Sequence, residues 1–149
     1  MKLEPNNITI ENFQPFGTLL TDSLSSPKWS NEQFDFTPDV YLYHYQKRLS
    51  SGILIGKKRP IKPNILEKHV ATSEILIQLV NDAILYLAER SIRNPSENDI
   101  SAFFLRQGEG VALKEGTWHW VPFPINTDCK TLIFFDEGTG DNDQFIHEL

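Results

Sequence analysis

The sequence predicts an all-β fold, a sandwich or barrel of short strands, from two observations. Turn-forming residues recur at short intervals, and the runs between them are rich in β-branched and aromatic residues. Strands are favoured at residues 41–45, 52–55, 100–105 and 131–135. Many short strands separated by turns every roughly 8 to 12 residues are typical of a sandwich or barrel.

Composition and length limit the classes of partner. The chain has 149 residues, of which 40% are hydrophobic, and we expect a single domain spanning residues 1–149. A net charge of −6 disfavours a nucleic-acid partner. No apolar run approaches the roughly 18 residues of a membrane helix, and residues 1–7 lack the apolar stretch of a signal peptide. We therefore expect a cytoplasmic protein that acts on a small molecule.

The loops and strands follow from local residue patterns. Residues 21–38 are polar and include Pro27 and Pro38, so we predict a long surface loop. Residues 90–99, which include Pro95, predict another loop. In the run 100–105, apolar residues occupy both alternating sets of positions, which favours a strand packed on both sides.

Residues 73–90 have two interpretations. Apolar pairs recur every four residues, which is typical of an amphipathic helix. Alternatively, residues 74–79 and 83–88 are two strands joined at Asn81-Asp82, a pair that tolerates a hairpin turn. Because the neighbouring segments are rich in strand patterns, we predict the hairpin.

Two segments carry residues suited to chemistry. In a strand, residues two apart share a face, so Glu67 and His69 point the same way, and a four-residue turn returns the chain to Glu74. In the second segment, Gly116 permits a tight turn and His119 begins the next strand. If both segments line one cavity, their two imidazoles and two carboxylates suit divalent Mn, Fe, Ni or Zn, or acid/base catalysis without metal.

This spacing resembles the two motifs of the cupin superfamily, His-x-His-x3-4-Glu and Gly-x5-Pro-x-Gly-x2-His, which supply metal ligands inside a small β-barrel. Glu67 occupies the place of the first histidine and His69 that of the second. Glu74 matches the glutamate and His119 the last histidine, whereas Lys114 replaces the proline.

The chain is similar, more narrowly, to the ureidoglycolate lyase family, also called ureidoglycolate hydrolase. The matching segments are residues 12–17, 66–69, 101–103, 108–111, 116–119 and 136–142. The resemblance implies a cupin-type double-stranded β-helix (jelly-roll barrel) and a homodimer. It also implies a carbon–nitrogen lyase that splits ureidoglycolate into glyoxylate and urea during allantoin breakdown.

The chain departs from the family at polar positions. The family usually reads Val-Asn-Tyr-His-Arg-Gly-Thr-Trp-His-His-Pro, where residues 111–121 read Val-Ala-Leu-Lys-Glu-Gly-Thr-Trp-His-Trp-Val. The family's Asp-Arg-Gly-Gly becomes Asp-Glu-Gly-Thr at 136–139. Two arginines, the usual bidentate partners of a carboxylate, are thus absent, and Lys114 could replace one of them as a point charge.

The resemblance and the residue chemistry together predict a site. We expect catalytic roles for His119, Glu74 and Lys114, and substrate contacts from Glu67, His69 and Lys114. Candidate metal ligands are Glu67, His69, Glu74 and His119. Two alternatives stay open: a cupin lyase or isomerase for another small hydroxy acid or sugar, and a non-catalytic cupin that binds a small molecule. The 10 Phe, 4 Tyr and 3 Trp also favour a homodimer, because aromatic residues are enriched at interface cores.

Overall fold

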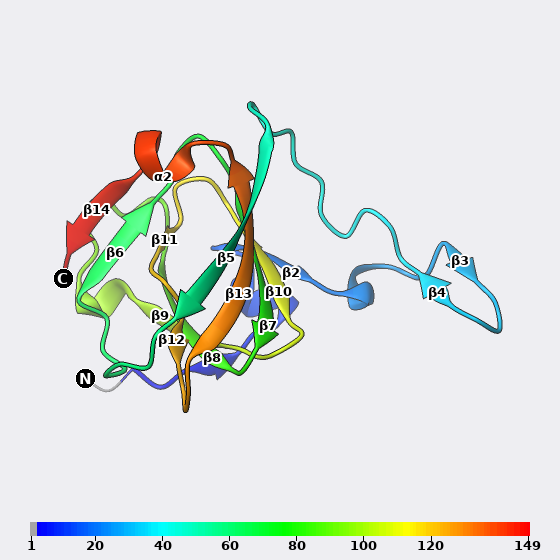
Figure 1. Cartoon of the computed structure of the whole chain (residues 1–149), viewed down its shortest axis with the longest axis horizontal. Coiled ribbons are helices and arrows are strands. Elements are labelled where there is room, and N and C mark those ends of the chain that lie inside the picture. Colours follow the sequence, from blue (N-terminus) through cyan, green and yellow to red (C-terminus); the bar gives the residue numbers. More distant parts are fainter. Residues whose placement is uncertain (1–2) are drawn as a thin grey trace.

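The chain folds into two β-sheets packed face to face, with an extended arm on one side (Figure 1). The structure, a computed structural model, describes residues 3–149. Met1 and Lys2, part of residues 1–7, which we predict to carry no signal peptide, lie outside the described residues. The predicted all-β, cupin-type barrel is confirmed. Among the described residues, no helix has both the length and the apolar character needed to span a membrane.

The larger sheet has seven strands in the order β1–β9–β8–β11–β6–β14, with β12 paired to β8. Its strands are β1 (Asn6–Asn7), β9 (Ser101–Leu105), β8 (Ala83–Ala88), β11 (Trp118–His119), β6 (Ile65–Lys68), β14 (Phe145–Glu148) and β12 (Phe123–Pro124).

The smaller sheet has five strands in the order β2–β10–β7–β13–β5. These are β2 (Gly17–Leu20), β10 (Gly110–Leu113), β7 (Glu74–Val80), β13 (Cys129–Asp136) and β5 (Leu49–Gly56). The remaining elements are a two-stranded ribbon of β3 (Trp29–Ser30) and β4 (Asp35–Phe36), the helices α1 (Ile10–Phe13) and α2 (Thr139–Asn142), and two single 3₁₀ turns, η1 (Asp22–Leu24) and η2 (Glu97–Asp99).

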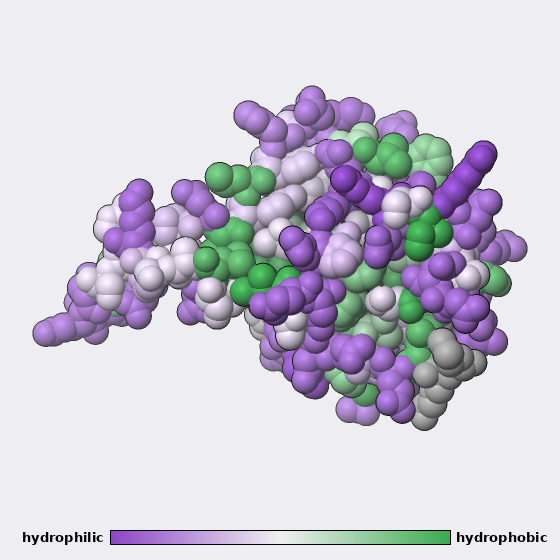
Figure 2. Space-filling model, turned by 180° about the vertical axis from the view of Figure 1, so that it is seen from behind, coloured by the Kyte–Doolittle hydropathy of each residue, from purple (hydrophilic) through white to green (hydrophobic). Residues whose placement is uncertain are grey.

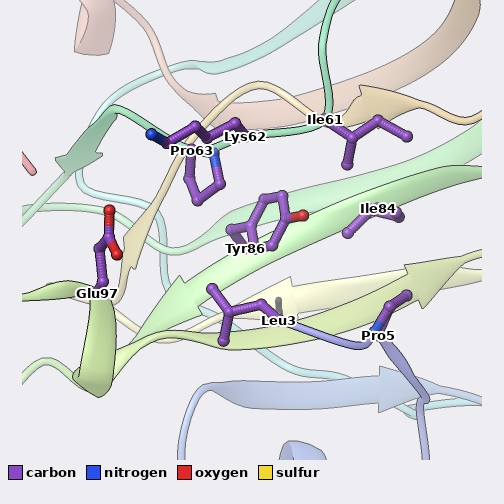
Figure 3. A pocket seen from close by; sticks show the side chains of 8 residues that line it. All are labelled: Leu3, Pro5, Ile61, Lys62, Pro63, Ile84, Tyr86 and Glu97. Carbon is purple, nitrogen blue, oxygen red and sulfur yellow. The ribbon is translucent and has the colours of Figure 1, made fainter. Parts of the chain in front are cut away.

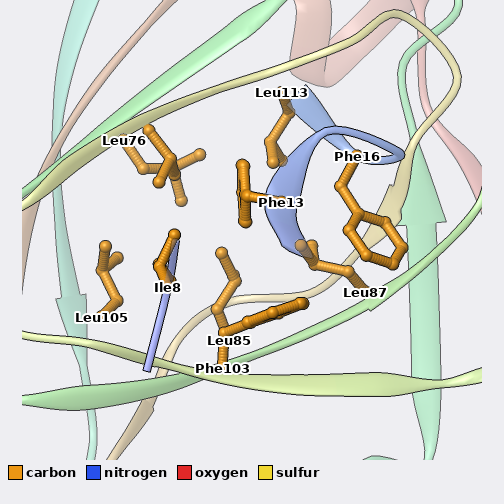
Figure 4. Close-up of a cluster of buried hydrophobic side chains, with 10 residues drawn as sticks. Ile8, Phe13, Phe16, Leu76, Leu85, Leu87, Phe103, Leu105 and Leu113 are labelled. Atoms are coloured by element: carbon orange, nitrogen blue, oxygen red, sulfur yellow. The ribbon is translucent and has the colours of Figure 1, made fainter. Parts of the chain in front are cut away.

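The main core lies between the two sheets (Figure 4). Leu76 on β7 packs there against Leu85 and Leu87 of β8, and the N-terminal segment adds Phe13, which is fully buried. Burying each such side chain stabilises the fold by roughly 1.5–3 kcal/mol. A second apolar cluster covers the opposite face of the larger sheet, so β9 is packed on both sides, as its residue pattern predicts.

The two strands predicted within residues 73–90 are confirmed, but the predicted hairpin between them is wrong. β7 pairs with β10 and β13 in one sheet, whereas β8 pairs with β9, β11 and β12 in the other. Asn81, with a φ of 61°, turns the chain from one sheet to the other. Its side-chain amide donates to the Thr127 hydroxyl and to the Asp128 carbonyl, both at 2.9 Å. The apolar faces of β7 and β8 therefore meet across the core rather than side by side.

The strand predicted at residues 41–45 is wrong. This segment belongs to no sheet, and side-chain contacts hold it instead. The Tyr41 hydroxyl donates to Ser73 Oγ at 2.5 Å, Tyr43 donates to the Glu115 carboxylate, and the two rings stack. Tyrosine has a high strand propensity, but a strand also needs a free sheet edge beside it, which sequence propensity does not report.

The predicted loops are largely confirmed. Residues 21–38 are mostly exposed and form the arm that extends from the barrel, although they contain the small β3–β4 ribbon (Figure 1). Residues 90–99 are irregular apart from η2. The strands predicted at 52–55, 100–105 and 131–135 lie within or over β5, β9 and β13.

Candidate functional site

The four residues predicted to share a site come from three strands and one turn at the same end of the barrel. Glu67 lies on β6 and is directly opposite His119 on the neighbouring strand β11. His69 follows β6, and Glu74 is the first residue of β7 in the other sheet. The turn between β6 and β7 thus brings a carboxylate of one sheet against two imidazoles of the other.

Short distances join these side chains into one cluster. Glu74 Oε2 lies 2.9 Å from His119 Nε2 and 3.3 Å from His69 Nε2. His119 Nε2 is also 3.9 Å from Glu67 Oε1. The structure therefore brings together Glu67, His69, Glu74 and His119, although they span 53 positions of the chain.

The cluster is shielded from solvent. Glu74 and His69 are each 5% exposed and His119 is 4% exposed. Glu74 Oε2 and His119 Nε2 are fully buried, and neither makes a well-aligned hydrogen bond with any residue of the described chain, 3–149. Buried polar atoms without such partners are costly. These two atoms are therefore candidates to bind a cation, a proton or a substrate.

Burial and mutual charge set the pKa values of the cluster. Burial alone would raise the pKa of Glu74, but the adjacent His119 and His69 lower it to about 2. Burial alone would lower the pKa of His119, but the charges of Glu74 and Glu67 raise it to about 9. The pKa of His69 is also raised, because its contact with Glu74 outweighs burial. Without a bound cation, Glu74 and His119 thus form an ion pair at neutral pH.

Backbone carbonyls hold the far side of each imidazole. His69 Nδ1 lies 2.6 Å from the Asp143 carbonyl oxygen, and His119 Nδ1 lies 2.9 Å from that of Thr117. Because a carbonyl can only accept, both Nδ1 atoms carry a proton. In each neutral ring the Nε2 lone pair then faces the cluster, as in metal-binding histidines.

A cavity of about 290 Å³ opens onto the cluster. Its walls come from β5, β13, the β6–β7 region and the segment that contains α2. The lining residues are Gly52, Ile53, Leu54, Glu67, His69, Glu74, Ile133, Phe135, Gly140 and Gln144. At Gly52 and Gly140, a Cβ atom would meet nothing within 4 Å, so both glycines leave the cavity wide. His119 is not among the lining residues and is linked to the cavity through its contact with Glu74.

The donor set fits a divalent metal ion. Glu67, His69 and His119 each offer one donor atom, and these three atoms lie within 4.8 Å of one another. Glu74 contacts both histidines. Two ligands that share a metal at about 2.1 Å lie roughly 3–4 Å apart, which matches the contacts within the cluster. Mixed imidazole and carboxylate ligands suit Mn, Fe, Ni or Zn. The structure thus contains a possible metal site at the predicted residues.

Lys114, predicted to act on substrate, lies outside this group. The residue is exposed, its ammonium group donates to the Gln14 carbonyl, and its backbone N–H donates to Phe16 at 2.9 Å. It joins the N-terminal segment to the end of β10 and is not among the residues that line the cavity.

A larger hollow, about 480 Å³, lies on the outer face of the larger sheet (Figure 3). Its walls are mainly apolar, with Tyr86 at the centre and Lys62 and Glu97 at the rim. The lining residues include one carboxylate and one ammonium group but no histidine. We therefore assign the chemistry to the smaller cavity, where titratable groups converge.

The sequence analysis did not identify the residues that hold the cluster side chains in place or shape the cavity. Asp143 contacts His69, and the Gln144 amide donates to the Glu67 carboxylate. Gly52 widens the cavity from the other side. The first two residues lie 74 and 77 positions from their partners, so no local spacing pattern links them.

The fold is similar to solved structures of low sequence identity. The capsular polysaccharide assembling protein CapF of Staphylococcus aureus is 18% identical, with a TM-score of 0.51 over 69% of this chain and 27% of that one. A variant of the oxalate decarboxylase OxdC of Bacillus subtilis is 16% identical, with a TM-score of 0.45 over 69% and 24%. This chain thus spans about a quarter of the length of the solved chains it matches.

Comparison with protein families is more specific. A search of curated proteins found no match. The family model described as ureidoglycolate lyase matches residues 1–148, which is nearly the whole chain and includes every residue of the cluster. The chain therefore belongs to the ureidoglycolate lyase family.

Proposed function

We propose that the protein is a ureidoglycolate lyase whose chemistry takes place at the Glu67–His69–Glu74–His119 cluster. The observation that carries this proposal is the convergence of four titratable side chains at a cavity of about 290 Å³, in a chain of this family. The proposed setting is allantoin breakdown in the cytoplasm.

The proposed reaction is an elimination without net change in protons. The hydroxyl of the carbinol carbon loses its proton, a C=O bond forms, the C–N bond breaks, and the departing nitrogen of urea gains a proton. Glu74 lines the cavity and is ionised at neutral pH, so its carboxylate is the group that accepts the hydroxyl proton. His69, which also lines the cavity and lies 3.3 Å from Glu74 Oε2, is the proton source for the nitrogen, and His119, 2.9 Å from the same oxygen, exchanges a proton with Glu74.

The substrate carboxylate needs a positive partner. No lysine or arginine is among the residues that line the cavity, so the protonated imidazoles or a cation held by the cluster must balance the charge. The four cluster residues would hold such a metal ion, which would supply Lewis-acid polarisation of the substrate hydroxyl. Glu67 and Glu74 alone would repel the anion.

Incubation of purified protein with ureidoglycolate tests the proposal. We expect glyoxylate to form above the uncatalysed rate, and His119→Ala to lower that rate at least tenfold, in line with the typical contribution of acid/base groups. His44→Ala is the matched control, since His44 is exposed and lies outside the cluster. Tight binding of a sugar acid without turnover would instead favour a non-catalytic cupin.

Lys114 needs its own variant. Its assignment to catalysis and substrate binding stays a prediction, since its ammonium group bonds to the Gln14 carbonyl outside the cavity. If the only role of Lys114 is this bond to Gln14, we expect Lys114→Met to retain the rate and KM of the wild type. A large rise in KM for this variant would show that Lys114 contacts the substrate.

We also propose a homodimer. Large apolar side chains are exposed on the arm, where Trp29 and Phe34 are each 51% exposed, and on the edge strand β5, where Ile53 is 58% exposed. Figure 2 shows apolar side chains gathered where the arm meets the barrel. Exposed apolar patches of this kind are typical of protein interfaces.

A further inference from the structure

Asp143 makes three hydrogen bonds to three consecutive residues at the site. Its carbonyl oxygen accepts from His69 Nδ1 at 2.6 Å. Its carboxylate accepts from the backbone N–H groups of Val70 at 2.9 Å and Ala71 at 2.8 Å. One residue thus fixes both the imidazole ring and the backbone that follows it.

Gln144, the next residue, contacts a second member of the cluster. Its side-chain amide donates to Glu67 Oε2, and the residue also lines the cavity. This leaves Glu67 Oε1 as the oxygen that faces His119, 3.9 Å away. Two successive residues therefore hold two of the four side chains of the cluster.

The topology explains why this segment reaches the site. β14 is the edge strand beside β6, with Phe145 opposite Lys68 and Ile146 opposite Glu67. Residues 143 and 144 immediately precede β14, and α2 immediately precedes them. The backbone N–H of Asp143 donates to the Thr139 carbonyl at 2.9 Å, which ties the segment to α2.

We propose that Asp143 and Gln144 are positioning residues for the reaction: Asp143 fixes the orientation and tautomer of His69, and Gln144 fixes the rotamer of Glu67. Neither residue belongs to the cluster that carries the proposed chemistry. The assignment of their role in turnover rests on the proposed function, whereas the effect of Asp143 on the geometry of His69 does not.

The expected effects follow from how such supports act. The Asp143 carbonyl belongs to the backbone and remains in every variant, so Asp143→Ala removes only the two bonds to Val70 and Ala71. The turn after β6 then loosens, and the His69 ring loses its single orientation. Outer partners of this kind typically contribute about 10- to 100-fold to activity or metal affinity. We expect kcat to fall by that factor with little change in KM.

The tautomer of His69 supplies a readout that is independent of turnover. The chain has four histidines, so ¹⁵N spectra of the imidazole rings are tractable, and His69→Gln assigns the His69 signal. In the wild type we expect neutral His69 to carry its proton on Nδ1. In Asp143→Ala we expect a mixture of tautomers, and in Asp143→Asn, which keeps one acceptor oxygen, an intermediate spectrum.

Asp141→Ala is the matched control, because Asp141 lies exposed on α2, two residues earlier. We expect its His69 spectrum and kinetics to equal those of the wild type. For Gln144→Leu, we expect at least a tenfold fall in kcat/KM with the His69 spectrum unchanged. Circular dichroism identifies variants that fail to fold, and for these Asp143→Asn replaces Asp143→Ala.

Two results would overturn the proposal. One is a wild-type spectrum in which neutral His69 carries its proton on Nε2. The other is Asp143 variants that keep the wild-type tautomer and kcat. If the wild type produces no glyoxylate but the spectra change as expected, the proposed function fails while the positioning of His69 stands.

Discussion

The contact between Glu74 and His119 makes stability depend on pH in the metal-free protein. The pKa of His119, about 9, lies above the 6.5 of a free imidazole, so its contribution is complete below pH 6.5 and is lost as the pH rises through 9. The pKa of Glu74, about 2, lies below the ordinary 4.5, so its contribution is complete above pH 4.5 and is lost as the pH falls through 2. Both are complete between pH 4.5 and 6.5.

Urea unfolding in the presence of EDTA measures this dependence. We expect the contribution of the pair to the free energy of unfolding to fall between pH 6.5 and 9. His119→Gln should flatten that part of the profile. Because a metal needs neutral imidazoles, a divalent ion should also compete with the proton on His119, and its affinity should rise with pH. A metal affinity that does not change between pH 5.5 and 8 would argue against imidazole ligands.

Gly52 sets the width of the cavity. A Cβ atom at Gly52 would meet nothing within 4 Å, so we expect Gly52→Leu to fold while its side chain fills part of the cavity. We expect kcat/KM to fall about 10- to 100-fold, because displacement of a substrate by an ångström has effects of that size. Gly56→Ala provides the contrast, since its Cβ would lie 2.7 Å from Cys129 Sγ and should lower stability instead. Steady-state kinetics and thermal unfolding separate the two effects.

Asn81 sets the path of the chain between β7 and β8. Its left-handed φ of 61° and its two side-chain hydrogen bonds all favour asparagine. Asn81→Ala loses both bonds and keeps a strained backbone, so we expect the free energy of unfolding to fall by about 1–3 kcal/mol. Asn81→Gly, which loses the bonds but relieves the strain, should cost less. Urea unfolding measures both.

The sequence predicts where the strands lie better than it predicts which strands pair with each other. The strands β5, β9 and β13 follow from runs of β-branched and aromatic residues between turns, and β7 and β8 follow from the strand-rich segments around them. Which sheet a strand joins depends on contacts far along the chain, so the separation of β7 from β8 has no local signal. The same limit explains residues 41–45, where tyrosines suit a strand but the segment pairs with no strand.

At the scale of the whole molecule, the resemblance to the cupin motifs predicts the four residues of the cluster. The residues that hold their side chains in place, Asp143 and Gln144, are found only in the folded structure. Glu67, His69, Glu74 and His119 match a spacing pattern, and the structure brings them together. Asp143 and Gln144 reach the same place because β14 pairs with β6. Lys114 matches the position of a family residue in sequence, but its side chain bonds to Gln14 outside the cavity.

The homodimer is tested at the same scale. If β5 and the arm contact a second copy, Ile53→Lys places charge within that contact, and we expect the molecular mass in solution to halve at micromolar concentration. Lys130→Ala on the neighbouring strand should leave the mass unchanged, since Lys130 is already charged and exposed. Light scattering after size-exclusion chromatography gives both masses. A wild-type protein that is monomeric under these conditions would contradict the proposal.

The pairing of β14 with β6 also has a kinetic consequence. The bonds that complete the site come from residues just before β14, an edge strand that pairs with β6 alone and adds no residue to the main core, so they form only once β6 is in place. The apolar core can collapse without them. During refolding from urea, the return of activity should therefore lag behind the recovery of tryptophan fluorescence, and the lag is the time that the chain takes to close its site.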